Sequence, residues 1–87
     1  MSIEETLKDR GSNYGDYGVN VEGVATIMGE LQHIHKAKTG EALNLIDYSN
    51  LNYLVIKLVR LAATPNHVDS YHDLAGYSTL MEEYYGD

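Results

Sequence analysis

The stretch DYSNLNYLVIKLVRLAATPN, residues 47–66, decides the fold class of this chain. Its apolar side chains recur with the 3.6-residue period of an α-helix, which predicts a helix with one buried face. Either Asp47 or Ser49 can cap its start, because both side chains accept hydrogen bonds from backbone N–H groups. The segment 64–66, Thr-Pro-Asn, ends the helix, since proline lacks the N–H that the next turn needs. The apolar face consists of Leu51, Leu54, Val55, Leu58, Leu61 and Ala62.

Two further helices flank this stretch in the sequence. One runs from residue 21 to about residue 38 and ends at Gly40, a residue type that favours the left-handed conformation found after helices. The other starts near residue 68 or 69 and extends to about residue 85. Their candidate core residues are Val21, Val24, Ile27, Met28, Leu31 and Ile34 in the first, and Tyr71, Leu74, Ala75, Leu80, Met81 and Tyr84 in the second.

The N-terminal part of the chain contains a shorter element and a loop. Residues 2–10 predict a short helix, with Ser2 as N-cap and Glu5 completing a capping box. Residues 11–20, GSNYGDYGVN, have the composition of a turn and predict an irregular segment. No stretch alternates apolar and polar residues strictly enough for a strand. We therefore expect one all-α domain over residues 1–87, with three main helices and a short N-terminal helix.

Size and charge limit the classes of function. The chain has 87 residues, no cysteine and a formal net charge of −7. A domain this small buries only about 60–65% of its unfolded surface, so we expect it to complete a helical bundle by self-association, as a homodimer or higher oligomer. The absence of cysteine excludes disulfides and thiolate chemistry. Negative charge disfavours direct nucleic-acid binding and anionic membranes. Without a membrane-spanning run or a signal peptide, the expected location is the cytoplasm.

Four charged side chains are the first candidates for a site. Lys57 and Arg60 lie three residues apart on one helix, and Asp69 and Asp73 follow on the next. Helices joined by so short a turn pack antiparallel, so Asp73 can face Lys57 and Asp69 can face Arg60. One interpretation is a pair of structural salt bridges. The other is a polar pocket in which the aspartates hold Mg²⁺ and the cations hold a nucleotide phosphate.

Tyrosine is the only aromatic residue type in the chain, which has eight tyrosines and no phenylalanine or tryptophan. Tyr14 and Tyr17 lie in the glycine-rich segment 11–18, where the flat ring of either residue could stack on a nucleotide base. The alternative interpretation is that these rings cover the helical core.

Three segments together resemble a known family. They are RGSNYGDY at residues 10–17, KLVRL at residues 57–61 and DSYHDLAGY at residues 69–77. In this combination they resemble a family of small bacteriophage and prophage proteins of unassigned function. They are more distantly similar to nucleotide-modification-associated domains and to the MazG-like all-α nucleoside triphosphate pyrophosphohydrolases.

The resemblance implies a phage-type accessory protein that binds a nucleotide or a nucleotide-derived signal. The MazG-like enzymes carry a cluster of glutamates on an earlier helix, whereas the first main helix here offers only Glu22 and Glu30, two turns apart. The resemblance therefore leaves open whether this chain is an enzyme. The implied roles are phosphate binding by Lys57 and Arg60, base stacking by Tyr14 and Tyr77, and metal or ribose contacts by Asp69 and Asp73.

A second class of function fits the same composition. A small acidic protein can act as an inhibitor by binding the basic surface of a host protein, such as a defence enzyme or one that binds nucleic acid. In that interpretation the lysine, arginine and aspartate pairs belong only to the scaffold. The expected partner is then a host protein and not a small phosphorylated ligand.

Overall fold

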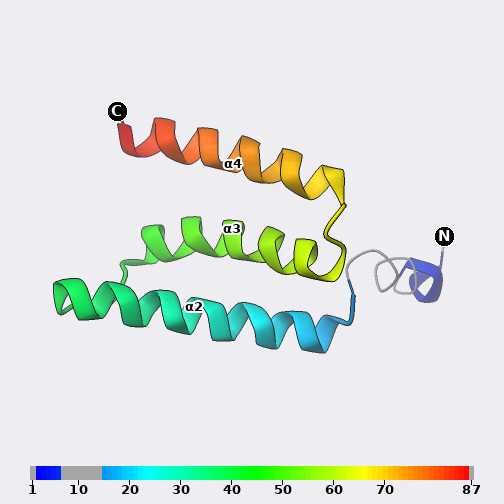
Figure 1. Ribbon diagram of the computed structural model, residues 1–87, viewed down its shortest axis with the longest axis horizontal. Coiled ribbons are helices and arrows are strands. Elements are labelled where there is room, and N and C mark those ends of the chain that lie inside the picture. Colours follow the sequence, from blue (N-terminus) through cyan, green and yellow to red (C-terminus); the bar gives the residue numbers. More distant parts are fainter. Residues whose placement is uncertain (1, 7–14, 87) are drawn as a thin grey trace.

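The computed structural model describes residues 2–6 and 15–86 of the chain. This part contains three long α-helices, α2 (Tyr17–Thr39), α3 (Leu45–Ala63) and α4 (Val68–Gly86). Residues 3–6 are also helical, and residues 2–6 and 15–86 contain no strand. Figure 1 shows the three long helices side by side, each antiparallel to the next, with α3 in the middle. The expected all-α fold with three main helices is confirmed.

Helix α2 begins earlier than its periodicity predicts. The side chain of Asp16 accepts a hydrogen bond of 2.9 Å from the N–H of Val19 and caps the helix, which starts at residue 17. The prediction of a loop over residues 11–20 is therefore wrong for residues 17–20, while Tyr14 lies outside the described residues. The predicted end is confirmed, because Gly40 has a φ of 79° and its N–H donates to the carbonyl of Lys36 at 2.7 Å.

Helices α3 and α4 are joined by the predicted proline turn. The N-cap of α3 is Asn44, whose side chain accepts from the N–H of Asp47 at 2.9 Å, so the prediction of a cap at 47 or 49 is wrong by a few residues. The helix ends at Ala63, directly before the Thr-Pro-Asn segment, as expected. Helix α4 then begins at residue 68, which was also expected.

At the N-terminus, the backbone N–H of Glu5 donates to the hydroxyl of Ser2 at 3.1 Å. This bond caps the turn of residues 3–6 and confirms the predicted start of the short helix. Residues 7–10, the rest of that predicted helix, lie outside the described part of the chain.

The core of this layer of helices is small. Helix α3 packs against α2 on one side and against α4 on the other. Within the described residues, the buried apolar side chains are Met28, Val55 and Leu61. The molecule measures 46 × 27 × 23 Å along its principal axes. The three long helices lie side by side along the longest axis, with α3 in the middle (Figure 1). In the part of the chain that the structure describes, no helix is both long and apolar enough to cross a membrane.

Candidate functional site at the α3–α4 interface

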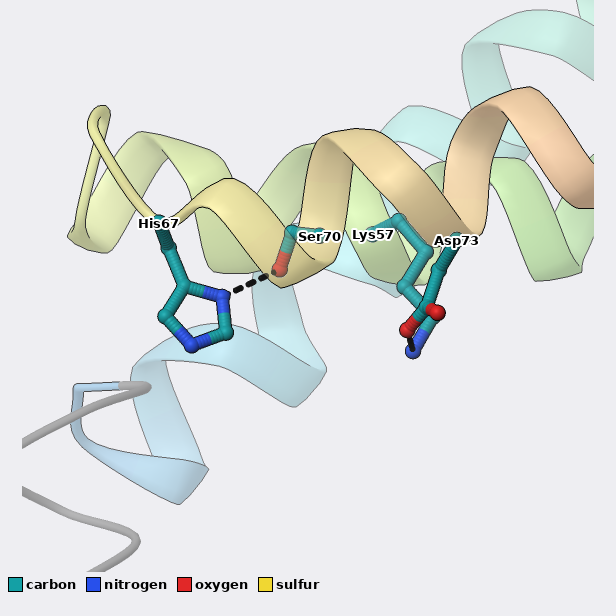
Figure 2. Close-up of polar contacts among 4 residues, drawn as sticks. All are labelled: Lys57, His67, Ser70 and Asp73. Atoms are coloured by element: carbon teal, nitrogen blue, oxygen red, sulfur yellow. Dashed lines mark hydrogen bonds and ion pairs between the residues drawn. The ribbon is translucent and has the colours of Figure 1, made fainter.

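An ion pair joins α3 to α4 near the middle of their interface. The ammonium Nζ of Lys57 lies 2.9 Å from the carboxylate Oδ2 of Asp73 (Figure 2). The side chain of Lys57 is only 13% exposed, whereas that of Asp73 is 44% exposed. The sequence-based prediction of a salt bridge between these two residues is confirmed. The ammonium of Lys57 is therefore largely shielded from solvent, whereas the carboxylate of Asp73 is partly open to it.

Positive charge surrounds the carboxylate of Asp73. Its pKa is lowered from the ordinary value of 3.8, chiefly by the hydrogen bond from Lys57. Partial burial opposes this shift, and the charges of Lys57, His72 and Arg60 add to it. Arg60 therefore acts on the same carboxylate as Lys57. Asp69, the acid that Arg60 was expected to face, is exposed, and their pairing stays a prediction.

This arrangement predicts a pH dependence at low pH. Because the pKa of Asp73 is lower in the folded chain than in the unfolded chain, the ion pair stabilises the fold above the ordinary value of 3.8. That contribution is lost as the pH falls through the lowered pKa. A carboxyl-carbon NMR titration should place the midpoint of Asp73 below 3.8. Lys57→Met should move this midpoint upward and Lys38→Met should not. An unchanged midpoint in Lys57→Met would contradict the conclusion that Lys57 lowers the pKa of Asp73.

An aromatic pair lies next to the ion pair. The rings of Tyr53 and Tyr77 are stacked, with centroids 5.2 Å apart and an angle of 26° between the planes. The ammonium of Lys57 is 5.9 Å from the centroid of the Tyr77 ring. At this distance a cation is attracted by the negative face of the ring. Helix periodicity explains the grouping on α3, since Tyr53 and Lys57 are four residues apart and share a face.

A groove of about 310 Å³ runs along this part of the α3–α4 interface. Its walls are mostly apolar and aromatic, and the Tyr53–Tyr77 pair forms part of them. A surface of this kind binds the flat, apolar part of a ligand, while nearby charged groups fix its polar part. The lining residues are Asn50, Tyr53, Tyr77, Leu80, Met81 and Tyr84.

Polar contacts involve the C-terminal end of α4 and the turn that precedes this helix. At the C-terminal end of α4, the hydroxyl of Tyr85 donates to Asp47 and accepts from Asn50, the latter at 2.9 Å. The bond to Asp47 is the main reason why the pKa of Tyr85 is raised above 10.0. At the turn between the helices, Nδ1 of His67 and the hydroxyl of the buried Ser70 are 2.8 Å apart (Figure 2). The Tyr85 contacts fix the C-terminal end of α4 against α3 beside the groove, whereas the contact between His67 and Ser70 orders the start of α4.

The structure brings together some of the predicted site residues. Lys57, Asp73 and Tyr77 form one cluster, and Arg60 acts on it electrostatically. Tyr14 lies outside the described residues. No group of three or more metal-ligating side chains occurs within residues 2–6 and 15–86.

One family model matches nearly the whole chain. The family model described as a domain of unknown function, DUF6378, matches residues 3–85. The chain belongs to the DUF6378 family. No curated protein and no solved structure shows significant similarity to it. The matched region of this DUF6378 protein includes α2, α3 and α4, and hence the complete groove with its ion pair.

Sequence reasoning missed three contributors to the site of this DUF6378 chain. Tyr53 could have been found from its spacing of four residues before Lys57, which places the two on one face of a helix. Asn50 and Tyr85 are 35 residues apart in sequence, and they meet only because α3 and α4 pack in one particular register. No local pattern in the sequence carries that information.

Proposed function

We propose that this DUF6378 protein binds a nucleotide, or a similar phosphorylated aromatic ligand, in the groove between α3 and α4. The supporting observation is the position of the Lys57 ammonium, 5.9 Å from the centre of the Tyr77 ring and beside an aromatic groove. A nucleotide has the matching parts, because its base stacks on aromatic rings and its phosphate binds cations. The base lies against the Tyr53–Tyr77 pair, and the phosphate lies toward Lys57 and Arg60.

Asp73 has a defined role in this proposal. Its carboxylate neutralises Lys57 when no ligand is bound, which reduces the cost of keeping a largely buried ammonium. An ammonium has three N–H donors, and the bond to Asp73 uses one of them. A phosphate oxygen takes another donor or displaces the exposed carboxylate. The ligand therefore either adds a second anionic partner to Lys57 or replaces the first.

The binding form in this proposal is a self-associated helical bundle. Support comes from the small core, because only three apolar side chains of the described residues are buried. Ligand binding and assembly are separate parts of the proposal, since different side chains carry them. The groove is complete within one chain, because all its lining residues lie on α3 and α4.

The proposal is tested by measuring how nucleotides change thermal stability and by calorimetry. Nucleoside mono-, di- and triphosphates, each with and without Mg²⁺, should include at least one that raises the melting temperature. A ligand at 100 times its dissociation constant stabilises by about 2.7 kcal/mol, which gives a clear shift. Lys57→Met should weaken binding about tenfold or more, because it removes a charge-assisted hydrogen bond.

Lys38→Met is the matched control, since it removes the same charge from the C-terminal end of α2, on an exposed side chain. It should leave nucleotide affinity unchanged. If no nucleotide in the panel shifts the melting temperature, the proposal is contradicted. The acidic inhibitor that binds a basic host protein would then be the function to test.

A further inference from the structure

The accessible surface of this chain exceeds that of a compact monomer of the same mass. Its accessible area is 6628 Å², whereas a compact 9.7 kDa monomer exposes about 5,100 Å². Its radius of gyration is 15.1 Å, against about 12 Å for a compact chain of this length. The excess of about 1,500 Å² lies in the range that each subunit buries in an obligate dimer, roughly 1,000–2,500 Å².

A stripe of leucines on α3 marks where the missing contact belongs. Leu51, Leu54, Leu58 and Leu61 follow one another at spacings of three, four and three residues, the pattern of a seam between packed helices. Although α3 lies between two other helices, the side chain of Leu58 is 51% exposed. Leu51 and Leu54 are half-buried, and only Leu61 is buried. The neighbouring helices of the same chain therefore cover only part of the stripe.

Helix α2 carries a second stripe of the same kind. Val24, Ile27, Leu31 and Ile34 repeat the spacing of three, four and three residues, and Ile34 is 63% exposed. Neither stripe contains a charged residue, although the chain has a net charge of −7. Identical acidic chains repel one another, so they associate through a face that lacks acids. The stripes meet this requirement.

We propose that a second copy of this chain docks on the α3 leucine stripe and presents its own stripe to it. In a two-fold dimer the same patch serves on both subunits, so a neutral leucine seam is complementary to itself. The excess accessible area of the chain matches the area that each subunit buries in an obligate dimer, so the occupant is a second copy. Only three apolar side chains are buried among residues 2–6 and 15–86, so a second subunit adds to a small core, and another copy is the partner that is present whenever the chain is present.

This dimer surface is distinct from the ligand groove. Leu58 follows Lys57 directly in sequence, so its side chain points about 100° away around the helix. A second copy on the leucine stripe therefore leaves the Lys57 ion pair accessible. The inference assigns a surface to the self-association that the proposed function includes, and it rests on that part alone. Nucleotide binding can fail while the dimer stands, and the reverse, because the groove is complete within one chain.

Sedimentation velocity and thermal unfolding of the full chain test the dimer. The wild type should sediment as a dimer at micromolar concentration. Because unfolding then also separates the subunits, its melting temperature should rise by about 4 °C for each tenfold increase in protein concentration. Leu58→Glu should abolish the dimer, since it places like charges in the seam.

Ile46→Glu is the matched control. Ile46 is also an exposed apolar residue of α3, but it lies about 120° around the helix from Leu58. This variant should remain a dimer. If Leu58→Glu proves unfolded, the concentration dependence of the wild type still decides the question. A wild type that stays folded and monomeric, with a melting temperature independent of concentration, would overturn the inference, as would a Leu58→Glu variant that remains a dimer.

Discussion

Replacing Met28 with alanine should lower the free energy of unfolding by about 3 kcal/mol. The side chain of Met28 is 1% exposed, and it is one of three buried apolar side chains among the described residues. The expected total stability of a chain of this length is about 4–13 kcal/mol. Deleting the thioether chain leaves a cavity between α2 and α3 that so small a core cannot fill. This single change should therefore remove a large fraction of the stability.

Urea denaturation at one fixed protein concentration measures this effect. Met28→Leu is the first control, because it nearly conserves the side-chain volume and should cost less than about 1.5 kcal/mol. Val21→Ala is the second control. Val21 lies on the same helix and is exposed, so its truncation should change stability by less than about 0.5 kcal/mol. Equal losses in Met28→Ala and Val21→Ala would show that Met28 does not anchor the core.

The sequence predicts the number and order of the main helices because each has a strong periodic pattern and a clear terminator. Gly40 and the Thr-Pro-Asn segment act through the local backbone, so their effect can be predicted without knowing the fold. The start of α2 was harder to predict. Residues 17–20 have the composition of a turn, but the helix includes them, with the N–H of Val19 donating to the Asp16 side chain and the N–H of Asn20 donating to the Asp16 carbonyl. Asn44 was missed as a cap because Asp47 and Ser49 suit the same role.

The site could be predicted only where one turn controls the geometry. The short connection after α3 forces an antiparallel pair, and this places Asp73 opposite Lys57. The same argument does not fix the position of a groove, because a groove depends on which side chains fail to fill the interface. Tyr53 and Tyr77 stack only because α3 and α4 pack in one particular register. The sequence around either tyrosine does not indicate that the other is its partner.

Replacing Asp73 with asparagine should tighten nucleotide binding, by about three- to tenfold. In the proposed site this carboxylate competes with the phosphate for Lys57 and repels it electrostatically. The repulsion of two charges a few ångströms apart near a protein surface is about 1 kcal/mol or more, which corresponds to a severalfold change in affinity. Asparagine keeps the shape of the side chain and removes the charge. Calorimetry with the nucleotide that stabilises the wild type best measures the change.

The sign of this effect distinguishes between two arrangements of the site. If Asp73 held Mg²⁺ for the nucleotide, as the resemblance to MazG-like enzymes implies, Asp73→Asn would weaken binding, and it would do so only when Mg²⁺ is present. If the carboxylate only balances the charge of Lys57, binding becomes tighter with or without the metal. Glu82→Gln is the matched control, because it also removes one negative charge from α4, from an exposed side chain that does not line the groove. Its effect measures the general loss of negative charge, so only the difference between the two variants reports on the contact with Lys57.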